Sequence, residues 1–464
     1  MKGTYYPGEG DIEVRVWQTT AERPFREIFT TPFTPHGYGD KAPIDVDSAV
    51  EDQPFLGLGV AMTDSSAWLL SRLSPERRRN LLDAVFSPDP TAGAGVSALR
   101  LTIGASDYST ALYTYDDVPG DVEMRHFSAA RDDRWLFPMI REAMAANPDM
   151  FLFAAPWSPP AWMKTNGALA GGSLKDGCEE AAARYVLAYV MACRARGIDL
   201  GAVNVQNEPF WGGPIYPTCT YSMEQLSRAT ISLCRLLRDS KCGTKVWYWD
   251  HNYSDAERVG AALEDPTLLS SIGGVAWHSY EPGAEDMGAL HRRHPDLPFY
   301  HTEQGPAIVS PERTERWWCD RLFDAFENGC RSFTAWNLCL SPDGQPLTGP
   351  HTCAGLLSVD HETGDVAPSA LYRVFRHVGP FVKRGARLLH ADGDRDGAAT
   401  TLWRNPDGGH VLVIGCSGRA EGREGPPRAR VHVKWRGEWL AVPLPMGPWS
   451  VTTVVFGPGT KSIP

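Results

Sequence analysis

The sequence predicts an α/β protein: a (β/α)8 barrel with an all-β sandwich side domain formed by both termini. From about residue 54, short apolar runs alternate with longer helical patterns. This alternation is typical of parallel strands that are buried on both faces and connected by helices. Beyond residue 383 the helical patterns stop, and short strands separated by turn sequences follow. We therefore assign residues 46–382 to the barrel, and residues 1–45 and 383–464 to the sandwich.

Eight nearly continuous apolar runs are the predicted barrel strands, each short enough for a buried strand. Some of the segments between them carry recognisable helix ends. Ser74-Pro75-Glu76 and Ser310-Pro311-Glu312 each have an N-cap residue, an N1 proline and a first-turn acid. Ser222 and Gln225 have the spacing of a capping box, and Gly197 follows the predicted helix 180–196 as a C′ residue. The predicted strands are residues 55–62, 98–103, 150–155, 202–205, 245–249, 274–277, 298–300 and 332–336.

A doubly wound sheet is the alternative to a barrel, but no Gly-x-Gly-x-x-Gly motif follows the first strand. The sandwich is predicted from alternating segments near both ends of the chain, and residues 30–39 are a predicted crossing loop rich in Pro, Gly and Thr. The predicted sandwich strands are residues 11–18, 400–403, 410–414, 429–435, 439–442 and 451–456.

Composition limits the function and the partners. The formal net charge of -11 argues against binding to nucleic acid or to an anionic membrane, because both repel an acidic protein. No run reaches the roughly 18 apolar residues of a membrane span, so stable membrane insertion is not expected. The first eleven residues contain no apolar signal segment, and the ten cysteines form no Cys-x-x-Cys pair. We expect a cytoplasmic protein with reduced thiols, or a secreted one if a signal has been removed.

Polar residues and aromatics follow the predicted strands, where barrel enzymes build their active sites. Asn207 and Glu208 end the fourth strand, and Glu303 ends the seventh. Two glutamates at strand ends supply the two carboxyls that cleave a glycosidic bond. Sixteen tryptophans are many for this length, and sugar rings commonly stack on aromatic side chains. Asp64, Asp250 and Asn252 are more simply explained as residues that brace the barrel mouth through hydrogen bonds.

Motifs of other hydrolase classes are missing. The chain has no His-x-His pair of a barrel metallohydrolase, no Gly-x-Ser-x-Gly of a serine hydrolase and no Gly-x-x-x-x-Gly-Lys-Ser/Thr phosphate loop. His291 and His294 lie on a charged, solvated stretch. We expect no metal and no cofactor, which leaves acid/base chemistry on carboxylates.

Four segments resemble glycoside hydrolase family 30, which includes lysosomal glucosylceramidase and its bacterial relatives. They are residues 57–68, residues 156–167 with the sequence Pro-Trp-Ser-Pro-Pro-Ala-Trp-Met-Lys-Thr-Asn-Gly, Val205-Gln-Asn-Glu-Pro209, and Thr302-Glu303. The resemblance runs from about residue 10 to the C-terminus. The second segment is highly specific, whereas Asn-Glu-Pro marks only the wider clan.

The resemblance implies a retaining double displacement, with Glu208 as general acid/base and Glu303 as nucleophile. It implies that Asn207 hydrogen-bonds the sugar 2-hydroxyl and that Arg100 lies beside Glu303 and keeps it ionised. It also implies a set of further substrate-binding residues: Asp107, Trp157, Trp162, His278, Tyr280 and Trp336.

Two positions depart from the family pattern. Ala335 replaces an Asp that often precedes the strand-eight Trp, which we expect to remove a contact with a sugar hydroxyl. Gln304-Gly305 replaces the Gly-Cys or Ala-Cys that follows many family nucleophiles. Both departures bear on the choice of substrate and not on the mechanism.

The predicted function is a retaining β-glycosidase of the glucosylceramidase or β-glucosidase kind that acts on a carbohydrate or glycoside. An endo-β-1,6-glucanase or a β-xylosidase of the same family is the first alternative. A non-catalytic carbohydrate-binding protein on a barrel scaffold is the alternative from another class, and loss of either glutamate would mark it. The residues do not determine the glycone, the aglycone or the oligomeric state.

Overall fold

Eight parallel strands form the barrel. The computed structural model describes residues 14–28, 42–306, 314–417, 430–445 and 448–458. The strands follow the order β11-β10-β9-β8-β7-β6-β5-β12, and a parallel bridge between Gln304 and Ala335 closes the ring between β11 and β12. Their bounds are β5 (Gly57–Met62), β6 (Ala98–Ile103), β7 (Phe151–Pro156), β8 (Ala202–Val203), β9 (Lys245–Asn252), β10 (Gly274–His278), β11 (Phe299–Glu303) and β12 (Ser332–Ala335).

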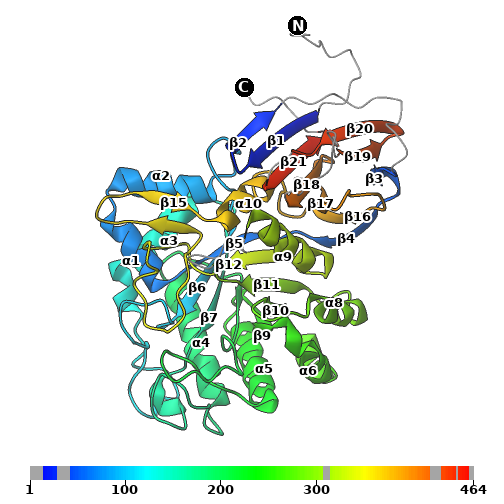
Figure 1. Cartoon of the computed structure of the whole chain (residues 1–464). Helices are drawn as coiled ribbons and strands as arrows, with labels where there is room; N and C mark the ends of the chain where they lie inside the picture. The colour runs from blue at the N-terminus through cyan, green and yellow to red at the C-terminus, as the bar shows by residue number, and fades with distance from the viewer. Residues whose placement is uncertain (1–13, 29–41, 307–313, 418–429, 446–447, 459–464) are drawn as a thin grey trace.

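Helices lie around the outside of this barrel (Figure 1). No helix among the described residues is both long and apolar enough to cross a membrane. The α-helices are α1 (Asp64–Arg72), α2 (Pro75–Phe86), α3 (Leu136–Ala146), α4 (Glu179–Arg194), α5 (Met223–Asp239), α6 (Ala256–Ala262), α7 (Pro266–Ser271), α8 (Ala284–Arg293), α9 (Glu315–Glu327) and α10 (Ala370–Val378). The short 3-10 helices are η1 (Val46–Ser48), η2 (Ala130–Arg134), η3 (Ala161–Met163) and η4 (Tyr253–Asp255).

The predicted helix ends are largely confirmed. Ser74 caps α2 through a hydrogen bond from Arg77 N, and Ser222 and Gln225 form both bonds of the capping box of α5. α4 ends at Arg194, two residues before the predicted end, and Gly197 has the positive φ of 73° that favours glycine. The predicted cap at residue 310 lies outside the described residues. α9 begins after Thr314, whose hydroxyl accepts from Trp317 N.

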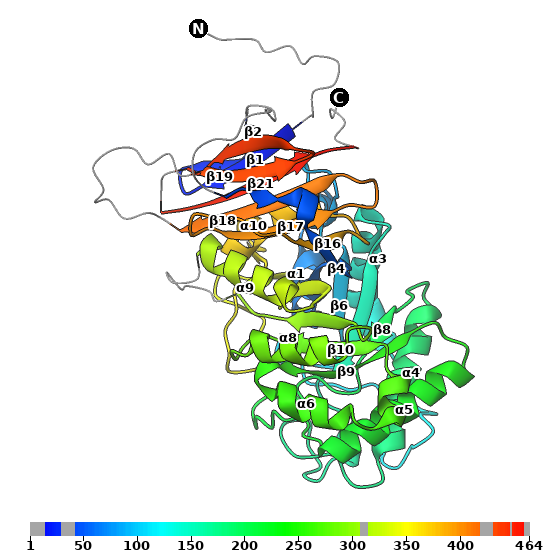
Figure 2. The ribbon, with the colours of Figure 1, turned by 90° about the vertical axis from the view of Figure 1, so that its right-hand side faces the viewer.

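Two sheet layers, the larger antiparallel and the smaller mixed, form the side domain at one end of the molecule (Figures 1 and 2). Leu412 and Ile414 of the larger sheet and Val433 of the smaller one bury their side chains between the layers. The larger sheet has the order β2 (Arg23–Ile28), β1 (Val14–Thr20), β21 (Trp449–Phe456), β18 (His410–Ser417), β17 (Ala399–Arg404), β16 (Arg387–His390) and β4 (Val50–Pro54). The smaller has the order β20 (Glu438–Pro443), β19 (Arg430–Trp435) and β3 (Ile44–Asp45), and a third sheet at the barrel mouth contains β13 (Cys339–Leu340), β14 (Leu357–Val359) and β15 (Val366–Pro368).

The other face of the larger sheet packs on the barrel. Val411 and Val413 alternate with Leu412 and Ile414, and they belong to the main core instead of the sandwich core. β4 falls inside the range 46–382 that the sequence assigns to the barrel, yet it pairs antiparallel with β16 of the side sheet. The predicted strand at 11–18 is described only from Val14, and the predicted loop at 30–39 lies outside the described residues.

His390 joins this side domain to a barrel helix. Its Nε2 lies 2.9 Å from Asp52 Oδ2 on β4, and its Nδ1 lies 3.0 Å from Glu327 Oε2 on α9. The hydrogen bonds to Asp52 and Glu327, against partial burial, raise the pKa of His390 to about 10. Since the folded pKa is above the usual value of 6.5, the charged histidine stabilises the fold fully below about pH 6.5 and loses this effect as the pH rises toward 10.

We expect His390→Gln to lower the free energy of unfolding below about pH 6.5 and to have no effect near pH 10. The ring is 37% exposed, so solvent screening limits the effect to about 1 kcal/mol. Urea unfolding of both proteins at several pH values measures the difference. A difference that is constant from pH 6 to pH 10 would show that the histidine acts through packing and not through its charge.

Candidate active site

The two candidate glutamates meet at the carboxyl ends of the barrel strands. Glu303 is the last residue of β11, and Glu208 follows β8. Glu208 has a φ of 46°, a value that non-glycine residues seldom adopt, and its backbone N donates to Asp250 O at 3.0 Å. One oxygen of Glu208, one of Glu303 and one ring nitrogen of His278 all lie within 4.8 Å of one another. The strand ends therefore bring the predicted pair into one site.

A cavity of about 490 Å³ opens onto this pair. Its size is that of a site for a small ligand. The lining residues are Asp107, Trp157, Glu208, Trp211, Tyr216, His251, Asn252, Tyr280, Glu281, Glu303, Gly305, Pro306, Trp336, His351, Thr352 and Cys353.

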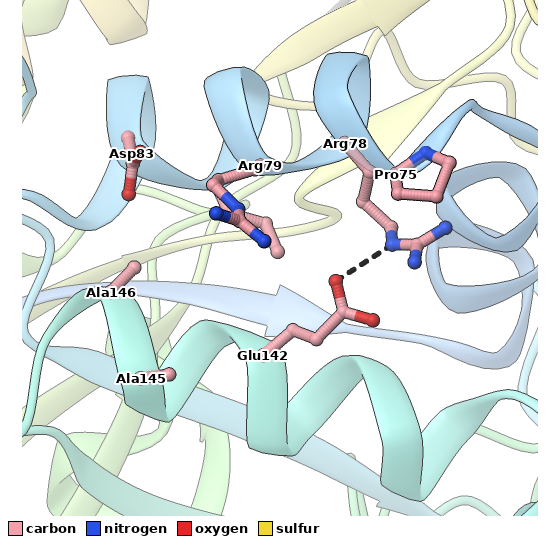
Figure 3. A pocket seen from close by; sticks show the side chains of 8 residues that line it. Pro75, Arg78, Arg79, Asp83, Glu142, Ala145 and Ala146 are labelled. Atoms are coloured by element: carbon pink, nitrogen blue, oxygen red, sulfur yellow. Dashed lines mark hydrogen bonds and ion pairs between the residues drawn. The ribbon is translucent and has the colours of Figure 1, made fainter.

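A second hollow of about 390 Å³ lies on the outside of the barrel between α2 and α3 (Figure 3). Arg78 Nε donates to Glu142 Oε2 at 2.7 Å across it. None of the residues that the sequence singles out for chemistry lines this hollow. It is a groove between packed helices and not the active site.

Arg100 and Tyr280 are two neighbours of Glu303 that favour its ionised form. Arg100 Nη1 donates to Oε2 of Glu303, and Tyr280 Oη donates to Oε1 at 2.8 Å. Arg100 is completely buried on β6 and also donates through Nη2 to Asn207 Oδ1 at 2.7 Å and to Asp250 Oδ2 at 2.8 Å. A buried guanidinium with these partners is a fixed positive charge at the base of the site.

His278 is the main hydrogen-bond partner of the Glu208 carboxyl. Glu208 Oε1 lies 3.0 Å from His278 Nδ1, and His251 Nε2 lies farther away at 3.9 Å. Burial raises the pKa of Glu208, but the hydrogen bond and charge of His278 outweigh it and hold that pKa below its ordinary value. Burial, with repulsion from Glu208, raises the pKa of Glu303 against the charges of His278 and Arg100. Two carboxyls this close share one proton over a wide pH range.

His278 bridges two carboxylates. Its Nε2 lies 3.3 Å from Asp250 Oδ1, on the opposite side of the ring from Glu208. Burial lowers the pKa of His278, but the charge of Glu303 and the hydrogen bonds to Asp250 and Glu208 raise it to about 9. Glu208, His278 and Glu303 have the spacing of a metal site. Both ring nitrogens of His278 lie within hydrogen-bonding distance of a carboxylate, an arrangement that suits a proton network.

Trp157 and Trp336 form an aromatic wall of the cavity. Their rings are stacked, with centroids 4.8 Å apart, and the Arg100 guanidinium lies 4.8 Å from the Trp157 centroid. Asp107 lies at the same cavity, and Asp107 Oδ1 is buried with no hydrogen-bond partner among the described residues. Burial, followed by repulsion from Glu303 and Glu208, raises the pKa of Asp107 well above its usual value. A sugar hydroxyl would give this carboxyl the partner that it lacks.

Four of the predicted binding residues do not line the cavity: Arg100, Trp162, Asn207 and His278. Asn207 is buried next to Glu208 in the chain; its Oδ1 accepts from Arg100, and its Nδ2 makes no hydrogen bond to any described residue. Trp162 is on η3, packs against the main core and donates through Nε1 to Asp116 O at 3.1 Å. The structure therefore groups Asn207 with the glutamates and separates Trp162 from them.

The two departures from the family pattern have different structural meanings. Ala335 is completely buried in the main core and does not line the cavity, and the loss of a sugar contact at this position stays a prediction. Gly305 does line the cavity, and a Cβ at this position would come within 2.8 Å of Cys353 Sγ. The space beside Gly305 is thus filled by the side chain of Cys353 from another loop.

The sequence did not predict most of the other residues that line the cavity. Tyr216 lies on the loop after Glu208, three residues before the completely buried Cys219. His351, Thr352 and Cys353 come from the loop between β13 and β14, which closes over Asp107 through hydrogen bonds from Thr348 N and Gly349 N to Asp107 O. Trp211 was detectable as an aromatic two residues after Pro209, whereas the β13–β14 loop carries no motif.

Lys164 explains part of the specific segment 156–167. It is buried, and its Nζ donates to Ser158 Oγ at 3.0 Å, to Thr218 O at 2.6 Å and to Leu169 O. These bonds tie the loop after β7 to the loop that follows Glu208. Burial lowers the pKa of Lys164 to about 8. The lysine therefore shapes the cavity without lining it.

We expect Lys164→Met to lower the free energy of unfolding by about 2–4 kcal/mol, because buried carbonyls lose their donor. Urea unfolding measures this loss. Lys175→Met is the matched control, since Lys175 is exposed on the same loop and donates to Trp162 O at the surface. Its effect should stay within about 0.5 kcal/mol. Equal stability of the two variants would show that Lys164 does not hold the loops together.

Comparison with known proteins identifies the family. The model described as "Glycosyl hydrolase family 30 TIM-barrel domain" matches residues 55–353, more than half of the chain. The chain belongs to glycoside hydrolase family 30. This family 30 protein is 29% identical over 397 residues to an endo-1,6-beta-D-glucanase of Neurospora crassa, with 81% of each chain covered. It is also 29% identical over 391 residues to the lysosomal acid glucosylceramidase of Mus musculus, with 78% of this chain and 75% of that protein covered.

Solved structures agree on the fold. The structure of SrfJ from Salmonella typhimurium has a TM-score of 0.85 and 24% sequence identity, and the alignment covers 95% of this chain and 99% of that one. A solved endo-beta1,6-glucanase has the same TM-score and identity, with 95% and 98% covered. The predicted barrel with a β-sandwich side domain is confirmed. As a family 30 member, the protein is a retaining glycoside hydrolase that acts on carbohydrate substrates.

Proposed function

We propose that this enzyme hydrolyses a β-linked glucoside with Glu303 as the nucleophile and Glu208 as the general acid/base. The observation that carries the proposal is the short gap between the two side chains, whose nearest oxygens lie within 4.8 Å. Retaining glycosidases place their carboxyls about 5–5.5 Å apart, whereas inverting enzymes need about 6.5–9.5 Å to admit a water. The gap supports direct attack by Glu303 on the sugar.

In the first step, a Glu303 oxygen attacks the anomeric carbon while the bond to the glycosidic oxygen breaks. Glu208 gives its proton to that leaving oxygen. Positive charge develops on the sugar ring beside Glu303, which favours the ionised form of Glu303 and leaves the shared proton of the pair on Glu208. Arg100 and Tyr280 keep their hydrogen bonds to Glu303 and hold the attacking carboxylate in place.

In the second step, a water attacks the anomeric carbon and the bond to Glu303 breaks. Glu208, now ionised, takes a proton from that water. His278 donates to Glu208 and stabilises this ionised form. Because Glu303 carries no charge while it is bound to the sugar, Glu208 loses its proton more easily at this stage than in the free enzyme.

The glycone subsite lies between Asp107, Asn207 and the stacked Trp157 and Trp336. Asp107 Oδ1 and Asn207 Nδ2 have no described partners and are available to sugar hydroxyls. The aromatic rings offer an apolar surface for one face of a pyranose. This arrangement and the named relatives support a glucosyl unit as the glycone.

A second candidate is endo-β-1,6-glucanase activity. His251, Asn252 and Glu281 line the cavity together with Trp211 and His351. Polar and aromatic groups of this kind suit a second sugar ring better than a lipid chain. The Neurospora crassa relative carries that activity in its name.

A substrate panel tests both candidates. We expect aryl β-glucoside to be cleaved faster than the β-xyloside, β-galactoside and β-fucoside, and NMR of the first sugar released to show the β anomer. Assays of a β-1,6-glucan and of glucosylceramide side by side show whether the enzyme prefers a sugar or a ceramide as the leaving group. Release of the α anomer first would overturn the proposed mechanism. Full activity in a chelator is expected, and its loss would point to a metal at Glu208, His278 and Glu303.

A further inference from the structure

We propose that Asp250 is a positioning residue that holds both cations of the active site and sets the pH range of the reaction. The inference rests on the proposed roles of Glu208 and Glu303. Asp250 touches neither the cavity nor any substrate position: it is completely buried and does not line the cavity. It acts through Arg100 and His278.

The side chain of Asp250 is bonded on both oxygens. Oδ2 accepts from Arg100 Nη2 at 2.8 Å, and Oδ1 accepts from Thr302 Oγ1 at 2.6 Å and lies 3.3 Å from His278 Nε2. The backbone O of Asp250 accepts from Glu208 N at 3.0 Å. One residue thus contacts the cation beside Glu303, the cation beside Glu208, and the main chain of Glu208 itself.

A local distortion of β9 aims this side chain inward. The parallel register between β9 and β10 shifts after Trp249, so that Ala276 faces Trp249 and Trp277 faces His251, which leaves Asp250 as an extra residue. Asp250 and Trp249 have φ values of 69° and 78°. A bulge of this kind re-aims a side chain beside an active site, and such strain persists only where the surrounding contacts fix it.

The charges of the buried cluster balance only with Asp250 included. Arg100 and protonated His278 supply two positive charges, and Asp250, Glu208 and Glu303 supply three carboxyls. The cluster is therefore neutral when the glutamate pair holds one proton, which is the state that the first step requires. Burial raises the pKa of Asp250, but the charges of Arg100 and His278 hold it well below its ordinary value, so this carboxyl stays ionised.

The other titratable groups around His278 leave this balance unchanged. Burial lowers the pKa of His251 and of His301, and it raises the pKa of Tyr280, so all three are neutral near pH 7. His301 Nδ1 also accepts from Thr334 N, which fixes a neutral tautomer. Burial, with repulsion from Glu303 and Glu208, raises the pKa of Asp107 well above its usual value, which favours its neutral form.

Removing the charge of Asp250 should shift the alkaline limb of the pH–activity profile to lower pH. A proton is lost more easily when a nearby buried negative charge disappears. We expect Asp250→Asn to shift the alkaline limb of kcat/KM to lower pH by about one unit or more. His278→Gln removes a positive charge from the same cluster and should shift that limb to higher pH.

The experiment measures kcat/KM of the full-length enzyme on an aryl β-glucoside between about pH 4 and pH 9. Each profile is scaled to its own maximum, so that a general loss of activity does not hide the shift. Thr302→Val is the matched control, because it removes a hydrogen bond to the same Asp250 oxygen without changing charge. Its profile should keep the wild-type limbs. Urea midpoints of all variants verify that each is folded.

Opposite shifts for Asp250→Asn and His278→Gln support the proposal. The proposal is overturned, and Asp250 is a structural residue only, if the pH profile of kcat/KM for Asp250→Asn keeps the wild-type limbs. It is also overturned if Thr302→Val shows the same shift as Asp250→Asn. If Asp250→Asn does not fold, the His278→Gln profile provides the test. The proposal is then overturned if the alkaline limb of His278→Gln lies at the same pH as that of the wild-type enzyme. Failure of the proposed function is distinguishable, because Glu208 and Glu303 variants would then keep their activity whatever Asp250 does.

Discussion

Glu303→Gln is expected to lower kcat at least about a thousandfold on every glycoside that the wild-type enzyme cleaves. Glutamine has the size of glutamate, but its amide oxygen is a poor nucleophile and carries no charge to stabilise the developing oxocarbenium ion. Arg100 would also face a neutral partner where it now faces a carboxylate. The loss should be independent of the leaving group, because no covalent intermediate forms. Steady-state kinetics on aryl glucosides of graded leaving-group acidity measures it.

Glu315→Gln is the matched control for this loss. Glu315 is buried on α9 and pairs with Arg373 at 2.5 Å, on the outside of the barrel. This variant should lose some stability and keep its kcat. Adding azide to Glu303→Gly tests the assignment further, because azide in the vacated space attacks from the face opposite the leaving group and gives the α-glycosyl azide. Substantial activity of Glu303→Gln without azide would remove Glu303 from the nucleophile role.

Much of the barrel was predictable because buried parallel strands have a simple sequence pattern. Residues 98–103 are the predicted and the observed bounds of β6, and every side chain of that strand is buried. β8 is shorter than predicted, because the chain bends at Val205 before it reaches Asn207 and Glu208. The polar ends of β8 and β11 were predictable for the same reason, since parallel strands bring their carboxyl ends to one edge.

The rest depends on contacts between distant segments, which no local pattern contains. The backbone hydrogen bonds that place the β13–β14 loop over Asp107 join positions about 240 residues apart. Trp162 belongs to a specific motif, yet its indole bonds to Asp116 O instead of facing the cavity. The motif identified the right segment, and tertiary packing decided which of its side chains reach the site.

The strained backbone at the site was also invisible in the sequence. Glu208 and Asp250 both adopt positive φ values, although neither position carries the glycine or asparagine that usually signals this conformation. The hydrogen bond from Glu208 N to Asp250 O links the two strained residues. The sequence reasoning described Asp250 as a brace of the barrel mouth. The structure gives that brace specific partners, Arg100 and His278, which serve the two glutamates.

Glu208→Ala should separate the two steps of the reaction. The first step needs a proton only when the leaving group is poor, so we expect losses of about 10²–10⁴-fold on alkyl glucosides and much smaller losses on substrates with acidic phenol leaving groups. The second step lacks its base for every substrate. The intermediate on Glu303 should therefore accumulate and produce a rapid burst of released phenol followed by slow turnover.

Azide completes the test of this assignment. It needs no general base, so it should attack the intermediate of Glu208→Ala, raise the steady-state rate and give the β-glycosyl azide, the opposite anomer to that expected from Glu303→Gly. His278 then faces an empty space instead of a carboxylate, and the alkaline limb that Glu208 contributes to the pH profile should disappear. Equal losses on good and poor leaving groups, with no burst and no azide product, would show that another residue delivers the proton.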